Sequence, residues 1–357
     1  MSDKLRVGLI GYGFASKTFH APLIVGTPGV ELAAVSSSDA SKVHADWPSV
    51  QVVSDPQALL DDPTLQLIVI PTPNDTHFPL AKAALNAGKH VVVDKPFTVT
   101  LSQARELDAL AKAKGLLLSV FHNRRWDSDF LTLKTLLADG ALGDVRYLES
   151  HFDRFRPEVR QRWREMKGPG SGIWFDLGPH VLDQALQLFG PPVAINVDMA
   201  ELRPGAQTTD YFHAVLTYPT RRVVLHASML VAAESARFVV HGTRGSYVKY
   251  GLDPQEDRLK AGERPPQEDW GYDVRNGTLT LAEGDVMVEK ELLTLPGNYP
   301  AYYAAILDAI AGTGAHPVQA EAAIQALEPI ELGFQLAESR PTRSLKCSNY
   351  TPPCGNR

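Results

Sequence analysis

Residues 6–16 read Arg-Val-Gly-Leu-Ile-Gly-Tyr-Gly-Phe-Ala-Ser, and this stretch decides the fold of the 357-residue chain. Within it, Val7–Ile10 form a short apolar run typical of a buried strand. Gly11 permits a tight turn, Gly13 lets a bound group approach the backbone, and Ser16 is small enough for a following helix to pack on the strand. The start of that helix would offer free N–H groups and a positive dipole end to phosphate. A lone Gly-x-Gly is often only a turn, but between a strand and a helix it predicts a dinucleotide-binding site.

The residues that follow this turn continue the alternation of short apolar runs and helical stretches. The apolar runs are expected to be strands, at Glu31–Val35, Leu67–Ile70, His90–Val93 and Leu116–Phe121. Helices are expected between them, at Ser16–Ile24, Pro79–Ala87 and Leu101–Lys114. This order predicts an α/β Rossmann domain, with a doubly wound parallel sheet, over residues 1–122.

The second part of the chain shows a different pattern, in which strands follow one another directly. After one helix at Phe130–Ala138, the strand-like segments are Val145–Phe155, Ala194–Leu202, Asp210–Tyr218, Arg222–Leu230, Arg237–His241 and Ser246–Lys249. Helical stretches at Tyr299–Ala311 and Gln319–Ser339 come last. We expect an α+β domain over residues 123–346 with a large open, mostly antiparallel sheet, and a tail over residues 347–357.

Composition and charge narrow the class of protein. Hydrophobic residues make up 44% of the chain and charged residues 21%, which is typical of a globular protein, and no apolar run is long enough to cross a membrane. The formal net charge of −6 argues against a nucleic-acid partner. Cys347 and Cys354 are too few for a disulfide framework or a four-thiolate zinc site, and the first strand starts too close to Met1 for an export signal. We therefore expect a cytoplasmic protein with no membrane, nucleic-acid or metal partner.

The residues after the second expected strand bear on which dinucleotide binds. Enzymes that use NAD usually place a carboxylate at this strand end to bind the ribose hydroxyls. Here the sequence is Val35-Ser-Ser-Ser-Asp39, so the position falls on serine. A neutral strand end does not repel the 2′-phosphate of NADP, to which Ser37, Ser38 and Lys42 could donate. This favours NADP over NAD, although no arginine clamps the phosphate and a serine-rich loop could accept either cofactor.

Three further groups of polar residues carry candidate chemistry. Asp94-Lys95 and Thr72-Pro73-Asn74, with His77, follow expected parallel strands, whose carboxyl ends present ligands at one edge of the sheet. Asp176 and His180 lie four residues apart near the expected start of a helix. Taken singly, each has an ordinary structural explanation: a surface turn for Lys95, a helix cap for Asp176, a core position for either histidine. Together they predict one crevice that holds an ammonium group, a carboxylate and an imidazole.

These motifs, in this order, resemble the Gfo/Idh/MocA family of oxidoreductases, and the resemblance covers nearly the whole chain. Besides the glycine turn and the groups above, it rests on Ala87–Val91, Asp94-Lys95-Pro96, Asn123–Trp126, Gly172–His180 and Pro317–Ser339. Asp94 departs from the family pattern, which usually has glutamate before Lys-Pro.

The resemblance implies a role for each candidate residue. Lys95 would contact a substrate oxygen, His180 would exchange the hydroxyl proton, and Asp176 would hold substrate hydroxyls. The implied cofactor-binding residues are Gly11, Tyr12, Gly13, Phe14, Ser16, Ser37, Ser38, Lys42, Thr72, Pro73, Asn74, His77, Asp94 and Lys95. The implied substrate-binding residues are Asn123, Trp126, Arg154 and Arg156.

A closer likeness is to the NADP-dependent scyllo-inositol 2-dehydrogenases of this family. It is carried by His122–Phe130, Phe155–Glu165, Asp210–His213 and Tyr250–Asp257. It implies that a polyol or sugar hydroxyl is the substrate. Relatives that act on another sugar, or that use retained NAD for epimerisation or glycoside cleavage, are the alternatives within the family. A non-catalytic sensor of dinucleotide or sugar is an alternative of another class.

The arginine-rich segment Arg154–Arg164 has two interpretations. It could form one wall of the substrate pocket, or it could be an ion-paired contact between subunits. The expected open sheet would need a cover for its exposed face. The resemblance makes a homodimer, or a dimer of dimers, the expected assembly.

Overall fold

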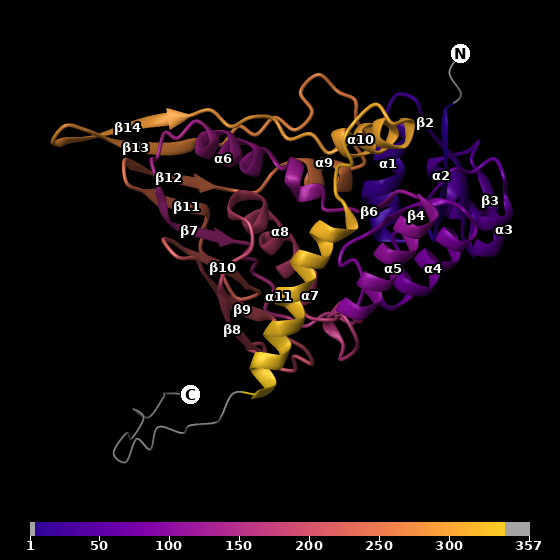
Figure 1. The fold of residues 1–357 in the computed structure, drawn as a ribbon, viewed down its shortest axis with the longest axis horizontal. Helices are drawn as coiled ribbons and strands as arrows, with labels where there is room; N and C mark the ends of the chain where they lie inside the picture. Colours follow the sequence, from indigo (N-terminus) through magenta and orange to yellow (C-terminus); the bar gives the residue numbers. More distant parts are fainter. Residues whose placement is uncertain (1–3, 340–357) are drawn as a thin grey trace.

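A computed structural model describes residues 4–339 of the chain (Figure 1). The predicted tail, with Cys347 and Cys354, lies outside the described residues. Among residues 4–339, no helix combines the length and the apolar character that crossing a membrane requires.

The N-terminal part is the predicted doubly wound α/β unit, a six-stranded parallel sheet in the order β3-β2-β1-β4-β5-β6. Its strands are β1 (Leu5–Ile10), β2 (Val30–Ser36), β3 (Gln51–Val53), β4 (Leu67–Ile70), β5 (His90–Val93) and β6 (Leu118–Val120). The connecting helices are α1 (Ala21–Val25), α2 (Ala40–Asp46), α3 (Pro56–Asp61), α4 (Asn74–Asn86) and α5 (Leu101–Lys114). Strand order reverses between β1 and β4, which is where sheets of this kind bind ligands, at the carboxyl ends of the strands.

Local sequence explains several of these boundaries. All four residues of β4 are buried, as its uninterrupted apolar sequence predicts. Helix α5 begins after Thr100, whose side chain accepts a hydrogen bond from the Gln103 N–H, and ends at Gly115, which has the positive φ of a left-handed C-cap.

The second part is an α+β unit built on an eight-stranded sheet in the order β14-β13-β12-β11-β7-β10-β9-β8. The strands are β7 (Val145–His151), β8 (Ala194–Ala200), β9 (Tyr211–Thr217), β10 (Arg222–Ser228), β11 (Ala236–Gly242), β12 (Gly245–Tyr250), β13 (Gly277–Glu283) and β14 (Val286–Leu292). Only the β7–β10 pair is parallel, so the sheet is mostly antiparallel, as predicted.

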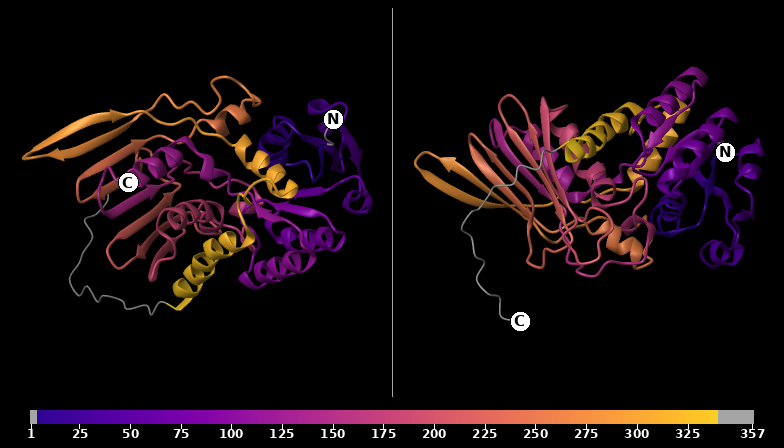
Figure 2. Two further views of the ribbon diagram at one scale, coloured as in Figure 1. Left: turned by 45° about the horizontal axis from the view of Figure 1, so that its top comes forward. Right: turned by 90° about the horizontal axis from the view of Figure 1, so that it is seen from below.

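One face of this large sheet is covered and the other is open. The helices α6 (Ser128–Ala138), α8 (Gly178–Phe189) and α11 (Ala320–Ser339) lie on the side that faces the parallel-sheet unit (Figure 2). Within the described part of the chain, no helix covers the opposite face, which we call the open face (Figure 2).

After β14, the chain returns to the N-terminal unit. Helix α10 (Pro300–Ala311) contacts α1 and β2. The Tyr302 hydroxyl lies 2.8 Å from the Ser119 hydroxyl, which donates to the Val318 carbonyl at 2.8 Å. The two units therefore share an extensive packed boundary, and the division at residues 122 and 123 stays a prediction.

The structure differs from the predicted elements in several places. Helix α4 begins at Asn74 and not at Pro79, where the predicted helix began. Pro73 immediately precedes its first turn, and Pro79 lies inside the helix. Strand β3 is only three residues long, too short for its sequence to stand out. The hairpin of β13 and β14 was not predicted, because β14 is exposed along most of its length and carries Glu289-Lys290-Glu291 where a half-buried strand would alternate.

Candidate active site

The glycine turn after β1 has the geometry that its sequence predicts. Gly11 adopts φ +82°, a left-handed conformation that side-chain-bearing residues rarely take, and its N–H donates to the Ser36 carbonyl at 2.8 Å. The Ser16 hydroxyl donates to the Gly11 carbonyl at 2.8 Å and fixes the turn against the next helix. No atom lies within 4 Å of the position that a Cβ on Gly13 would take. The backbone of the turn is therefore open to a bound diphosphate.

The helix after the turn starts with an unexpected segment. Residues Ser16–His20 form a short π-helix that continues into α1, where sequence predicted one regular helix. His20 is buried there, and its Nδ1 lies 2.6 Å from the Tyr303 hydroxyl. Phe14 stands 57% exposed above the turn and packs edge-on against Phe19.

A cleft of about 370 Å³ joins the glycine turn to the end of β2. Tyr12 lines one side, and its hydroxyl donates to Asp46 at 2.9 Å. Ser37, Ser38 and Lys42 line the other side, as the NADP interpretation requires. Asp39 also lies here, but its Oδ1 accepts from the backbone of α2, at the Ser41 and Lys42 N–H groups. Its carboxylate is thus occupied as the N-cap of α2.

The residues that follow β4 and β5 connect the loops that line the crevice through hydrogen bonds. His77 lies between two carbonyl oxygens, with Nδ1 2.9 Å from that of Pro96 and Nε2 2.9 Å from that of Thr72. Asn74 donates from Nδ2 to the Gly170 carbonyl at 2.8 Å and so joins α4 to a loop of the second unit. Both side chains therefore position the walls of the crevice through the backbone.

Lys95 and Asp176 form the central ion pair. Lys95 Nζ donates to the Asp176 carbonyl oxygen at 2.7 Å and lies 3.1 Å from its Oδ1, and both side chains are mostly buried. The backbone N–H of Lys95 donates to Asp94 Oδ1 at 2.8 Å. Asp176 ends the short helix α7 (Ile173–Asp176), and Arg164 Nε lies 3.6 Å from the same carboxylate oxygen. Burial alone would raise the pKa of Asp176, but the charges of Lys95 and the neighbouring arginines hold it well below its usual range.

His180 lies in the first turn of α8 and is 5% exposed. Its Nδ1 has no hydrogen-bond partner among the described residues. Burial, reinforced by the positive charges of Lys95 and Arg124, holds the pKa of His180 well below its usual value. The imidazole is therefore neutral at neutral pH and is able to accept a proton.

The four predicted substrate-binding residues lie in two different settings. Asn123 and Trp126 belong to a 3-10 turn, η2 (Asn123–Trp126); Asn123 is buried, and the Trp126 ring packs edge-on against Tyr302. Arg154 follows β7, and its guanidinium lies over the Phe152 ring at 5.2 Å. The pKa of Arg154 is lowered from its usual value, mainly by burial and also by the repulsion of Arg124, and the charge of Asp176 offsets part of this effect. Arg156 lies farther along, with its backbone N–H donating to Met229.

Two protein-family models match the two units of the chain. A model described as "Oxidoreductase family, NAD-binding Rossmann fold" matches residues 5–122, and one described as "Oxidoreductase family, C-terminal alpha/beta domain" matches residues 134–343; both are models of the Gfo/Idh/MocA group. The chain belongs to the Gfo/Idh/MocA oxidoreductase family.

Relatives of this Gfo/Idh/MocA oxidoreductase extend over its whole length. It is 74% identical to the uncharacterized oxidoreductase YdgJ of Escherichia coli (strain K12), over 97% of this chain and 100% of that protein. It is 38% identical to scyllo-inositol 2-dehydrogenase (NADP(+)) IolW of Bacillus subtilis (strain 168), over 96% of this chain and 97% of that one. A solved oxidoreductase structure from Yersinia pestis superposes with a TM-score of 0.92 at 71% identity, covering 95% of this chain and 96% of that one. The chain is therefore an NAD(P)-dependent dehydrogenase that acts on hydroxyl groups.

Two charged residues near the site were not named among the predicted site residues of this family member, although Arg164 ends the arginine-rich segment for which a pocket wall was one interpretation. Arg164 Nε lies 3.6 Å from Asp176, and Arg124 is a buried residue of η2 that pairs with Glu256 and lies 3.3 Å from Asp127. The positive charge of Arg124 also contributes to the lowered pKa of His180. The sequence shows both arginines within basic runs, but only the fold tells which members of a run turn inward.

Proposed function

We propose that this chain oxidises a hydroxyl of a cyclic polyol or sugar with NADP, and that scyllo-inositol is its best substrate. The observation that carries the proposal is the grouping of the Lys95–Asp176 ion pair with a neutral His180 at the carboxyl edge of the parallel sheet. The cofactor site that this needs is supported by the open backbone at Gly13 and by the cleft at the end of β2.

Each residue of the group has one part in the reaction. The nicotinamide, when bound, supplies the acceptor for the hydride that leaves the substrate carbon. His180 accepts the proton of the hydroxyl group on that carbon, so that the C–O bond becomes a carbonyl. Lys95 donates a hydrogen bond to the same oxygen and stabilises its negative charge as it develops. Asp176 holds the Lys95 ammonium in place and accepts from a neighbouring substrate hydroxyl.

The surroundings of this group suit a substrate with many hydroxyls. Asp176 offers acceptor oxygens, whereas Asn123, Arg154 and Arg156 would add donors around the same crevice. The likeness to a protein named as a scyllo-inositol 2-dehydrogenase over nearly the full length supports that polyol as the first one to test.

The assay that tests the function follows the absorbance of reduced nicotinamide with purified protein, scyllo-inositol and either NADP or NAD. We expect turnover with NADP, and weaker or no turnover with other inositols and with aldoses. Turnover with an aldose alone would move the proposal to another sugar. Tight cofactor binding without net reduction of added cofactor would replace it with a retained-cofactor reaction, or with a sensor if no substrate is altered.

A separate prediction tests the preference for NADP. Ser37→Asp places a carboxylate where the NADP phosphate would lie, and like charges at contact distance cost enough to lower kcat/KM for NADP by about 10–10²-fold. The value for NAD is expected to stay within a few fold. Ser102→Asp, on the exposed side of α5, is the matched control with the same added charge. Equal losses for NADP and NAD would contradict the assignment of the phosphate to this end of β2.

The proposal extends to assembly and location. The open face of the large sheet carries half-buried side chains of β7, β9 and β10, and a second copy of the chain would cover it as a homodimer, or within a dimer of dimers. A cytoplasmic address is part of the same proposal, since the chain has only two cysteines, too few for the disulfide framework of an exported protein.

A further inference from the structure

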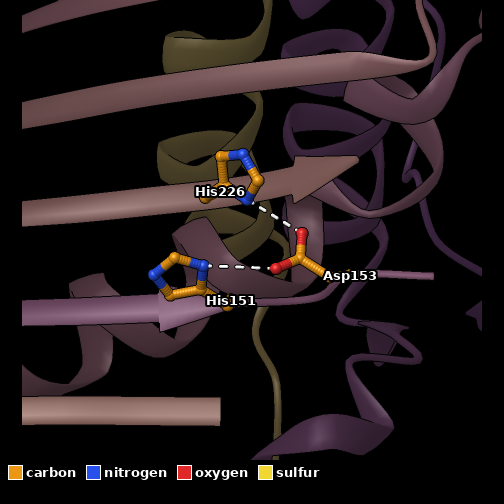
Figure 3. A group of neighbouring side chains, drawn as sticks. All are labelled: His151, Asp153 and His226. Atoms are coloured by element: carbon orange, nitrogen blue, oxygen red, sulfur yellow. Dashed lines mark hydrogen bonds and ion pairs between the residues drawn. The ribbon is translucent and has the colours of Figure 1, made fainter. Parts of the chain in front are cut away.

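The open face of the large sheet gathers histidines from neighbouring strands. β7 and β10 run parallel, and their register places His151 beside His226. Alternation along each strand turns Leu148, Ser150 and Leu225 toward the covering helices, and therefore turns Glu149, His151 and His226 to the open face. Figure 3 shows the two imidazoles converging on Asp153, which follows the end of β7.

Each of the three side chains directs an atom that can ligate a metal toward the space between them. Asp153 Oδ1 lies 2.8 Å from His226 Nδ1, and Asp153 Oδ2 lies 3.3 Å from His151 Nδ1 (Figure 3). One ligand atom from each of the three residues falls within 4.8 Å of the other two. Ligand atoms around a tetrahedral zinc ion lie about 3.3 Å apart, given zinc–ligand distances near 2.0 Å, so shifts of about an ångström would suffice to admit the ion.

Further contacts hold the ligands in the form that a metal needs. His151 Nε2 lies 2.9 Å from Glu149 Oε2, and a proton held there leaves the Nδ1 lone pair free for an ion. The Tyr147 hydroxyl donates to the same glutamate. On the other side, Ser235 Oγ donates to Asp153 Oδ2 at 2.7 Å and the Ser228 N–H donates to Oδ1 at 3.1 Å. Carboxylate–histidine pairs and hydrogen-bonded carboxylates of this kind surround metal sites built for function or structure.

We propose that His151, Asp153 and His226 form a site for a divalent transition-metal ion, with zinc as the ion that fits best. Two imidazole nitrogens and one carboxylate oxygen are a ligand set that suits zinc rather than calcium or magnesium, which take oxygen ligands. A water molecule completes the fourth position. A cavity of about 270 Å³ borders the site, and His151, Asp153 and Ser235 contribute to its wall.

This site stands apart from the dehydrogenase site and departs from the sequence prediction of no metal. The carboxylate oxygens of Asp153 face the open side of the sheet, whereas Lys95 and Asp176 lie between the two units. No complete metal-binding motif marks the site in the sequence, because His226 joins His151 and Asp153 only through the pairing of β10 with β7.

The test measures zinc binding by full-length protein in the absence of cofactor and substrate. Protein stripped with a chelator and then dialysed against zinc chloride is expected to retain one zinc per chain, determined by elemental analysis. Cobalt in place of zinc should give the visible absorption of a four-coordinate ion with nitrogen and oxygen ligands. His226→Gln is expected to weaken zinc binding at least a hundredfold, and Glu149→Gln, which removes the carboxylate charge next to His151 Nε2 and leaves the three ligands in place, by about 10–100-fold.

His241→Gln is the matched control, since His241 is an exposed histidine on neighbouring β11 and its Nδ1 lies near Ser246, away from the three ligands. Wild-type protein that retains no zinc, or zinc binding that His226→Gln and Glu149→Gln leave unchanged, would overturn the proposal and leave the group as an ion-paired network. If His226→Gln fails to fold, as judged by circular dichroism, the zinc affinity of Glu149→Gln alone tests the proposal. The outcome does not depend on dehydrogenase activity, so failure here and failure of the proposed reaction are separate results.

Discussion

Lys95→Met is expected to lower kcat for polyol oxidation by about 10²–10³-fold, the loss typical of removing one charge-stabilising donor from an active site. Methionine fills nearly the same volume but carries no charge and donates no hydrogen bond. The substrate oxygen then has no cation next to it while the hydroxyl proton leaves. Because this contact strengthens as the charge develops, the loss should appear in kcat more than in KM.

Two variants make the result interpretable. Lys82→Met removes a lysine of the same unit whose partner, Glu106, is exposed on the surface, and it should leave kcat within about twofold. Lys95→Arg keeps the charge but changes the shape of the donor, and it should recover only part of the activity. Binding of reduced cofactor, followed by fluorescence, should persist in all three. If Lys95→Met retained more than a fifth of the wild-type kcat, Lys95 would be a structural partner of Asp176 and not a participant in the reaction.

The parts of the fold that sequence predicted well are those in which local chemistry and burial agree. β4 and β5 occupy the predicted ranges, because helices bury both strands and each apolar run stops shortly before polar residues. Helix α5 also matches, because Thr100 and Gly115 set both ends through hydrogen bonds that lie within a few residues.

The parts that were missed depend on contacts that sequence spacing does not encode. β14 is held mainly by its pairing with β13, so its exposed residues follow no apolar pattern. In the site, the spacing of Asp176 and His180 pointed to one crevice, but Lys95 reaches Asp176 across the boundary of the two units, and Arg124 is drawn inward by Glu256 and Asp127. The Lys95–Asp176 and Arg124–Glu256 pairs join residues far apart in the sequence, so spacing alone does not reveal them.

His180→Asn is expected to lower kcat for polyol oxidation by about 10²–10⁴-fold, the contribution typical of a general base. Asparagine keeps a polar side chain of similar reach, but it does not accept a proton near neutral pH. His241→Asn, at an exposed position of β11, should leave kcat unchanged and controls for the loss of a histidine. Wild-type kcat in His180→Asn would assign the proton transfer to another group.

The pH dependence separates a base role for His180 from a merely structural one. Burial and the charges of Lys95 and Arg124 hold the pKa of His180 well below the ordinary value of about 6.5, so the base stays neutral and kcat/KM should stay flat as pH falls from 8 to about 6. Lys95→Met removes one of those charges, so the acid limb of its residual activity should move to higher pH. The unfolded chain binds the His180 proton near pH 6.5 and the folded chain only at lower pH, so this group makes stability fall as pH drops below about 6.5. His180→Asn should therefore flatten the acid side of a plot of unfolding free energy against pH, measured by urea titration. A structural histidine would give the same stability change but would not link the acid limb of activity to Lys95.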